Sequence, residues 1–281
     1  MPRVRIVTDS GCDIPASLLQ RLSITVVPFG VRIGERVYWD RVNITPDQFY
    51  RRLASGRQPV TVFAPTATSF HDAFVQLGRR TDAVVSIHSS SKLSDSFIAG
   101  VAAKSLLSNH LRVVVIDSLS VSLGLGFIVL AAAMAAHRGD PLDEIVAHVR
   151  SMILQTHVLF ALDTAEYLER NAKLAKFRAS LGDLVEARPL VQIEDGIFDL
   201  AEKVRTRAKA IERLYEFVEL FPHIEELGVL YSTTPADADS LVKRIDTVFP
   251  KEQVVVSQYG PAVGIYLGPG ALGVAAYEGK G

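Results

Sequence analysis

Three short apolar runs in the N-terminal half of the chain each end in a cluster of polar residues, and each precedes a helical pattern. The runs are Arg5–Thr8, Ala83–Ile87 and Arg112–Ile116, and the polar clusters are Asp9-Ser10, His88-Ser89-Ser90-Ser91 and Asp117-Ser118. Alternating strands and helices predict a parallel sheet with helices on both faces. In such sheets, ligands lie outside the carboxyl ends of the strands. The sequence therefore predicts a site lined by hydroxyls and carboxylates at this edge, with Ser118 among its ligand-binding residues.

The pattern of elements changes near residue 156, where strands become more frequent. We expect strands at 158–162, 189–193, 227–231, 254–257 and 272–276, and helices at 207–220 and 236–248. Asp195-Gly196 is typical of a tight hairpin turn. Before residue 156 we expect a hairpin at 31–39 and helices at 14–21, 45–53, 70–77, 94–107, 122–138 and 142–155. We predict an α/β protein of two lobes, a doubly wound parallel sheet in 1–156 and a mixed α/β lobe in 157–281.

Composition excludes several classes of protein. With 30 basic and 31 acidic residues the net charge is -1, which gives no electrostatic reason to expect nucleic acid or anionic membrane as a partner. The longest apolar run, 123–136, is too short for an integral membrane segment and suits a buried helix. The N-terminus does not resemble a signal peptide, and the single cysteine, Cys12, is expected to be buried. These features favour a cytoplasmic protein.

Motifs that could indicate a cofactor or a metal lack the neighbouring residues that such sites require. A literal GxGxxG at 268–273 has no helix, strand and acidic residue after it, so we interpret it as a glycine loop that allows close backbone contact. The seven histidines show no metal-ligand spacing, and we predict neither a metal nor a cofactor. His88 follows a buried strand and is expected to be structural.

Four segments, in order, resemble the signature of the DegV family. They are VTDSGCDIP at 7–15, SIHSSSKLSDSF at 86–97, VIDSLSVSLGLG at 115–126 and GPAVGIYLGPGALGV at 260–274. The resemblance implies a two-lobed bacterial protein that holds a long-chain fatty acid in a buried tunnel between the lobes. It also implies that the protein is not an enzyme and presents the fatty acid carboxylate to a separate fatty acid kinase.

The resemblance also assigns roles to individual residues. Ser94 matches the serine that holds the carboxylate in the family. Val62 occupies the position of a threonine in the family, and we expect it to form only part of the pocket wall. Tyr266 occupies the position of a histidine, and we expect its hydroxyl to donate one hydrogen bond. Lys173 replaces an arginine linked to the kinase, which makes it the candidate partner contact. These departures predict weaker hydrogen bonding to the ligand carboxylate, or a ligand with a different head group.

Physical chemistry supports this interpretation and leaves alternatives open. An acyl chain gains about 0.8 kcal/mol for each buried CH2, whereas its carboxylate needs hydrogen bonds. Neutral hydroxyls such as Ser94 supply them, although serines at this place also cap helices. One alternative is a hydrolase or transferase acting on a small acid or phosphate, with Asp9 or Asp117 as base. Another is a lipid-responsive binding module with a different partner.

Overall fold

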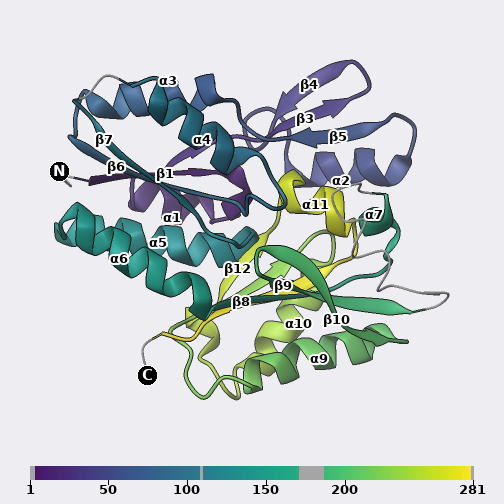
Figure 1. The fold of residues 1–281 in the computed structure, drawn as a ribbon. Coiled ribbons are helices and arrows are strands. Elements are labelled where there is room, and N and C mark those ends of the chain that lie inside the picture. The colour runs from purple at the N-terminus through teal and green to yellow at the C-terminus, as the bar shows by residue number, and fades with distance from the viewer. Residues whose placement is uncertain (1–3, 108–109, 171–186, 280–281) are drawn as a thin grey trace.

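The computed structural model describes residues 4–107, 110–170 and 187–279 (Figure 1). It contains a four-stranded sheet, a six-stranded sheet and a three-stranded sheet. The first two form successive layers of the molecule, and helices lie between them and on their outer faces. The predicted α/β architecture is therefore confirmed.

The four-stranded sheet is entirely parallel and has the order β2-β1-β6-β7. Its strands are β1 (Val4–Asp9), β2 (Thr25–Val27), β6 (Ala83–His88) and β7 (Arg112–Asp117). One face packs on α3 (Ala67–Gly78) and α4 (Ser96–Ser105), and the other packs on α5 (Ser122–Arg138) and α6 (Leu142–Met152). All six residues of β6 are buried, as expected of a strand covered on both faces.

Helix α5 lies between the two larger sheets. It contacts β1 and β6 on one side and strands of the six-stranded sheet on the other, and 13 of its 17 residues are buried. A Cβ added to Gly124 would lie 2.5 Å from Cγ2 of Val158, and one added to Gly126 would lie 2.8 Å from the carbonyl oxygen of Cys12. Small residues are needed here because a side chain of β8 (Thr156–Ala161) and the backbone at Cys12 approach this helix closely. The buried helix predicted from the apolar run is confirmed.

The six-stranded sheet has the order β10-β9-β8-β13-β11-β12, and only its β11–β12 pair is parallel. Its strands are β8 (Thr156–Ala161), β9 (Arg188–Glu194), β10 (Ile197–Val204), β11 (Glu226–Tyr231), β12 (Val255–Gln258) and β13 (Leu272–Tyr277). Helices α9 (Arg207–Glu219) and α10 (Pro235–Ile245) cover its outer face. This is the mixed α/β lobe that the sequence predicts. The boundary near residue 156 stays a prediction, because one apolar core runs across it around α5.

A small antiparallel sheet, β4-β3-β5, lies beside the parallel one. The predicted hairpin is confirmed as β3 (Gly30–Ile33) and β4 (Arg36–Trp39). Strand β5 (Val60–Phe63) was not predicted, because its four residues are only partly buried or exposed and carry little periodic signal. The capped helix α2 (Pro46–Ser55) connects β4 to β5.

The remaining elements are short. They are α1 (Ala16–Arg21), α7 (Glu166–Glu169), α11 (Pro261–Leu267) and the 3-10 turns η1 (Ser10–Cys12), η2 (Ile153–Gln155) and η4 (Lys251–Gln253). Helix α11, which precedes the glycine loop at 268–273, was not predicted from the sequence. Proline at its first position, which is common at helix starts, is the signal that could have identified it. The GxGxxG motif follows α11 and leads into strand β13, so its surroundings are not those of a dinucleotide site.

Candidate functional site

The polar ends of the parallel strands meet as the sequence predicts, and Asp9 lies at their centre. Its Oδ1 accepts hydrogen bonds from Gly11 N at 3.1 Å and Ser89 Oγ at 2.7 Å. Its Oδ2 accepts from Ser89 N at 2.9 Å and Ser96 Oγ at 2.6 Å. Burial raises the pKa of this carboxyl, and the four hydrogen bonds oppose that rise. We call Asp9, Gly11, Ser86, His88, Ser89 and Ser96 the Asp9 cluster.

His88 belongs to the scaffold of this cluster. Its Nδ1 lies 3.0 Å from Ser96 Oγ, its Nε2 lies 2.8 Å from Ser86 Oγ, and its ring packs on Phe70. Burial lowers the pKa of His88 to about 3, so the imidazole is neutral at pH 7 and its 3.8 Å approach to Asp9 is not an ion pair. Because Ser96 donates its hydroxyl hydrogen to Asp9, it accepts from His88 Nδ1, and Ser86 donates to Nε2. The structural role expected for His88 is confirmed.

The chain forms a turn directly after β7, the third strand with a polar end. Asp117 accepts hydrogen bonds from Ser91 N at 3.2 Å and from Leu119 N at 3.0 Å. The Ser118 hydroxyl donates to Ser120 O at 3.2 Å and accepts from Ser120 N at 3.1 Å. Ser118 is buried and does not line the slot described next, so the geometry gives it a role in the turn. Its ligand role stays a prediction that this structure does not support.

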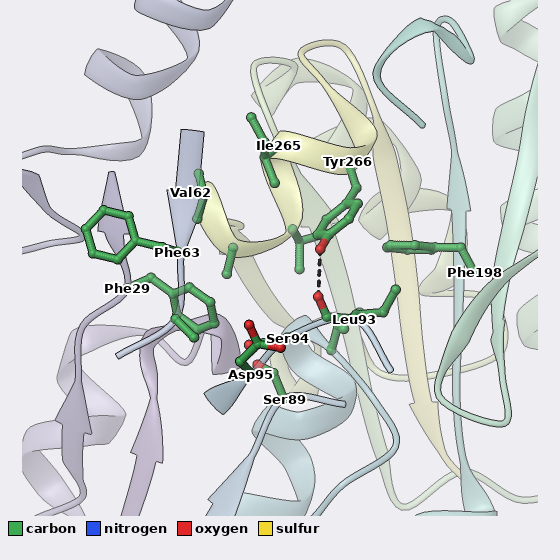
Figure 2. A pocket seen from close by; sticks show the side chains of 14 residues that line it. Phe29, Val62, Phe63, Ser89, Leu93, Ser94, Asp95, Phe198, Ile265 and Tyr266 are labelled. Atoms are coloured by element: carbon green, nitrogen blue, oxygen red, sulfur yellow. Dashed lines mark hydrogen bonds between the residues drawn. The ribbon is translucent and has the colours of Figure 1, made fainter. Parts of the chain in front are cut away.

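An apolar slot of about 230 Å³ opens beside the Asp9 cluster (Figure 2). It lies between strand-end loops, the small antiparallel sheet, β10 and α11, and thus at the junction of the lobes. Its lining residues are Phe29, Val62, Phe63, Ala64, Ser89, Leu93, Ser94, Asp95, Val121, Phe198, Ala262, Val263, Ile265 and Tyr266. Ser89, Ser94 and Asp95 gather at one end in Figure 2, and Val62 and Ile265 lie toward the other.

Three of the predicted site residues line this slot. Ser94 is partly buried, and its Oγ accepts a hydrogen bond from Ser96 N at 3.1 Å, so it also supports the start of α4. The Tyr266 hydroxyl points across the slot and donates to Leu93 O at 2.7 Å (Figure 2). Val62 forms part of the wall. The structure brings these residues together, and their contacts with a ligand stay a prediction.

The sequence did not identify two aromatic walls of the slot. Phe29 follows β2, and Phe198 lies on β10 just after the predicted hairpin turn. In that turn Asp195 and Gly196 have φ values of 47° and 78°, and Gly196 O accepts a 2.5 Å hydrogen bond from Ser90 Oγ. The serine-rich loop thereby holds the hairpin that carries Phe198. No local pattern could reveal this contact, because 106 positions separate its partners.

A second cavity of about 510 Å³ adjoins the slot and shares Val62, Ile265 and Tyr266 with it. Tyr167 and Arg170, from the segment around α7, also line this cavity. Arg170 forms an ion pair with Glu166. The candidate partner contact Lys173 lies outside the described residues.

Acidic and basic side chains also meet where α11 begins. Asp13 accepts hydrogen bonds from Arg41 at 2.9 Å, Gly260 N at 2.8 Å and Ser122 Oγ at 2.7 Å. Asp40 faces Gly260, and a Cβ on that glycine would lie 3.0 Å from its Oδ2. We call Asp13, Asp40, Arg41, Ser122 and Gly260 the junction cluster. It fixes the start of the helix that carries Tyr266, and the sequence analysis did not identify it.

Other possible site chemistry has little support in the described part of the chain. There, no three histidine, cysteine or acidic side chains gather as a metal ion would require. No described helix has the length and apolar character needed to cross a membrane. Cys12 is a buried free thiol, and its burial raises the pKa of the thiol. This agrees with the packing role predicted for Cys12, since a neutral buried thiol is unreactive.

The fold and the slot define a class: an α/β protein of two lobes with an apolar ligand slot at their junction. Residues 3–279 match the sequence model described as "Uncharacterised protein, DegV family". The chain belongs to the DegV family, and the resemblance seen in its sequence is confirmed.

Relatives of known sequence and structure agree with this assignment. A DegV domain-containing protein of Streptomyces coelicolor is 34% identical over 96% of this chain and 97% of its own length. A fatty-acid-binding DegV family protein from Thermus thermophilus superposes with a TM-score of 0.90 at 28% identity, covering 98% of this chain and 99% of its own. DegV of Bacillus subtilis, described as a fatty acid binding protein, gives a TM-score of 0.90 at 26% identity over 99% and 100% of the two chains.

Proposed function

We propose that this protein is a non-catalytic lipid-binding protein that holds a long-chain fatty acid in the slot, with the head group at Ser94. The observation that carries the proposal is the slot itself, which is apolar along its walls and has hydroxyl groups at one end. The fatty-acid-binding descriptions of the Thermus thermophilus and Bacillus subtilis relatives support it.

The walls supply the affinity in this proposal. Phe29, Phe198, Leu93 and Ile265 are among the side chains that would exclude water from an acyl chain. Each CH2 group buried in this way contributes about 0.8 kcal/mol. The adjoining cavity shares a wall with the slot, so it offers room for the far end of a long chain to form a buried tunnel.

We further propose that the head group is presented to a partner kinase. Ser94 is only partly buried and Asp95 is exposed, so the polar end of the slot lies where a second protein could reach it. The single buried thiol fits a reducing, cytoplasmic compartment. Incubating the lipid-loaded protein with ATP and a cognate kinase should yield an acyl-phosphate. Lipid binding without that product would favour a lipid-responsive module with another partner.

The alternative of an enzyme acting on small acids or phosphates has weaker support. Its candidate bases are Asp9 and Asp117, and both already accept hydrogen bonds from backbone N–H groups. Asp9 is fully buried behind Ser89. Neither carboxylate is therefore placed to take a proton from a substrate in the slot.

Filling the slot tests the proposal directly. Ala64 lines the slot, so Ala64→Phe should weaken fatty acid binding by about tenfold or more, which corresponds to about 1.4 kcal/mol. Ala236 is exposed at the start of α10, and Ala236→Phe is the matched control. Isothermal titration calorimetry with dodecanoic acid measures the affinity, and native mass spectrometry of the purified protein detects retained lipid. Equal affinity in both variants would place the lipid elsewhere.

A further inference from the structure

A groove of about 800 Å³ lies outside the slot, between helix α2 and the hairpin of β3 and β4. Residues of α2, of both strands and of the segments that follow β4 and α2 line it. Figure 1 shows these elements together beside the parallel sheet. The groove shares no described lining residue with the slot, and its volume is within the range of pockets that hold small organic molecules.

Three arginines, Arg51, Arg52 and Arg57, line this groove. All three residues are exposed, and within the described part of the chain none of them forms an ion pair with a carboxylate. Arg51 Nε donates a hydrogen bond at 3.3 Å to Asp47 O, a carbonyl of its own helix. Because a guanidinium group stays protonated in proteins, the groove holds three positive charges without a direct counter-charge from the described residues.

The acidic residues nearest to these arginines in the sequence lie elsewhere. Asp47 accepts a hydrogen bond at 2.7 Å from Gln258 Nε2, which belongs to the C-terminal lobe. Asp40 is buried in the junction cluster, and Glu35 lies in the turn between β3 and β4. None of these three acids lines the groove. The local charge of the groove is therefore positive, although the net charge of the chain is -1.

The groove also has an apolar floor. Ile33 and Ile44 line it and are each only 4% exposed, and the half-buried ring of Tyr38 lies on the same lining. Hydrocarbon beneath charged groups lowers the local dielectric constant and strengthens their attraction for an anion. This floor and ring could also contact an apolar or planar part of a bound molecule.

Two amide side chains add hydrogen-bond donors to the lining. Gln48 Oε1 accepts from Thr45 N at 2.9 Å, and Asn43 Oδ1 accepts from Trp39 N at 2.6 Å. In each amide the oxygen is thus used within the chain, and the NH2 group, which can only donate, is the part that remains for a ligand. Guanidinium and NH2 groups together suit an anion with several acceptor oxygens.

We propose that the groove binds a soluble organic phosphate, with its phosphate groups on Arg51, Arg52 and Arg57 and a planar group against Tyr38. A guanidinium group presents its N–H donors as a fork that matches two phosphate oxygens. Three such groups favour an anion that carries two or more negative charges, such as a nucleoside diphosphate. The proposal does not rest on lipid binding, because the groove is separate from the slot.

Calorimetric titration with three probes tests the proposal in magnesium-free buffer of low ionic strength. Adenosine diphosphate should bind with a dissociation constant of about 0.1 mM or less. Inorganic pyrophosphate lacks the planar group and should bind about tenfold more weakly, whereas adenosine lacks the charge and should not bind measurably. Equal affinities for pyrophosphate and adenosine diphosphate would overturn the contact with Tyr38, and no binding of either would overturn the whole inference.

Removing positive charge from the groove should weaken this binding. The double variant Arg52→Gln, Arg57→Gln should bind adenosine diphosphate about tenfold or more weakly, because it loses two charge-assisted contacts. Arg79→Gln, Arg80→Gln is the matched control, since both arginines are exposed at the end of α3 and neither lines the groove. Equal affinities of the two double variants for adenosine diphosphate would contradict the assignment.

Adding negative charge provides a second test that leaves the arginines in place. Ser55 is the last residue of α2, lines the groove and donates to Arg52 O at 2.8 Å. Ser55→Asp should weaken binding of adenosine diphosphate by about fivefold or more through like-charge repulsion. Ser105, the last residue of α4, donates in the same way to Ala102 O at 2.7 Å, so Ser105→Asp is the matched control and should have no effect. A similar loss in both variants would contradict the proposed site.

Lipid head groups carry the same phosphate chemistry, and vesicles distinguish this source from a soluble ligand. Sedimentation with vesicles of phosphatidylcholine and phosphatidylglycerol should give equal binding for the two double variants. If adenosine diphosphate fails to bind and vesicle binding falls only in Arg52→Gln, Arg57→Gln, the arginines contact a membrane surface and the inference is wrong. Neither pair of arginines lines the slot or the adjoining cavity, so titration with dodecanoic acid tests the proposed function separately.

Discussion

Two carboxyl groups, Asp9 and Asp40, are almost equally buried but have different surroundings. Both side chains are no more than 1% exposed. Asp9 accepts four hydrogen bonds in the Asp9 cluster, whereas within the described residues neither oxygen of Asp40 accepts a hydrogen bond of normal geometry. Burial raises the pKa of Asp40 to about 7, and the charge of Arg41 and the nearby Ser10 hydroxyl offset only part of that effect.

The difference shows that burial alone does not decide what an acid contributes to stability. Burial raises the pKa of both carboxyls, but four hydrogen bonds oppose that rise at Asp9, and fewer favourable contacts oppose it at Asp40. The Asp9 cluster therefore acts as a rigid base beneath the slot. The junction cluster, which fixes the start of α11, contains a group that changes charge near neutral pH.

The largest expected effect comes from removing the central acid of the Asp9 cluster. Asp9→Ala leaves two backbone N–H groups and two hydroxyls without their acceptor, and should lower the free energy of unfolding by about 3–5 kcal/mol. Urea denaturation at pH 7 measures it, with Asp72→Ala on the exposed face of α3 as control. If the two variants were equally stable, the four hydrogen bonds would contribute nothing.

Asp40→Asn should raise the free energy of unfolding, and the size of this increase should depend on pH. The pKa of Asp40 in the folded protein, about 7, lies above the ordinary aspartate value of 3.8. The contribution of Asp40 to stability is therefore fully present below pH 3.8 and is lost as the pH rises to about 7. Between about pH 5.5 and about pH 8.5 the wild type should lose about 2 kcal/mol relative to Asp40→Asn. Thermal or urea unfolding at both pH values tests this, and a pH-independent difference would contradict it.

The smallest expected changes in the free energy of unfolding come from removing one hydroxyl from each cluster. Ser96→Ala removes the link between His88 and Asp9 and should cost about 2 kcal/mol, because it leaves a buried ring N–H unpaired. Ser122→Ala should cost only about 1 kcal/mol, because Asp13 keeps Arg41 and Gly260 N as partners. Ser105→Ala, at the exposed end of α4, is the control for urea denaturation. Equal losses for Ser96 and Ser122 would remove the contrast between the clusters.

Much of the fold could be predicted because its signals are local. The apolar runs of β1, β6 and β7, each followed by polar residues and a helix, indicated a parallel sheet whose carboxyl edge carries the Asp9 cluster. The run of leucine, alanine and glycine in α5 indicated a helix buried on all sides. The order of the family-like segments placed Ser94, Val62 and Tyr266 in one site, and all three line the slot.

Other features of the site depend on contacts between distant segments. Strand β5 exists because it pairs with β3, and α11 is held by Asp13, which precedes Gly260 by 247 positions. The aromatic walls Phe29 and Phe198 come from different lobes. Ser118 directly follows β7, near the other polar strand ends, but its hydroxyl forms hydrogen bonds with Ser120 in its own loop. The residue types at the strand ends do not predict this direction of the side chain.

The sequence by itself determined the alternation of elements, the burial of α5 and the polar strand ends, because periodicity and residue type act over a few neighbouring positions. The tertiary structure decided which hydroxyl hydrogens are already used, which acids receive donors and which walls enclose the slot. Those properties depend on atoms within about 3 Å that belong to residues far apart in the chain, so no local pattern records them.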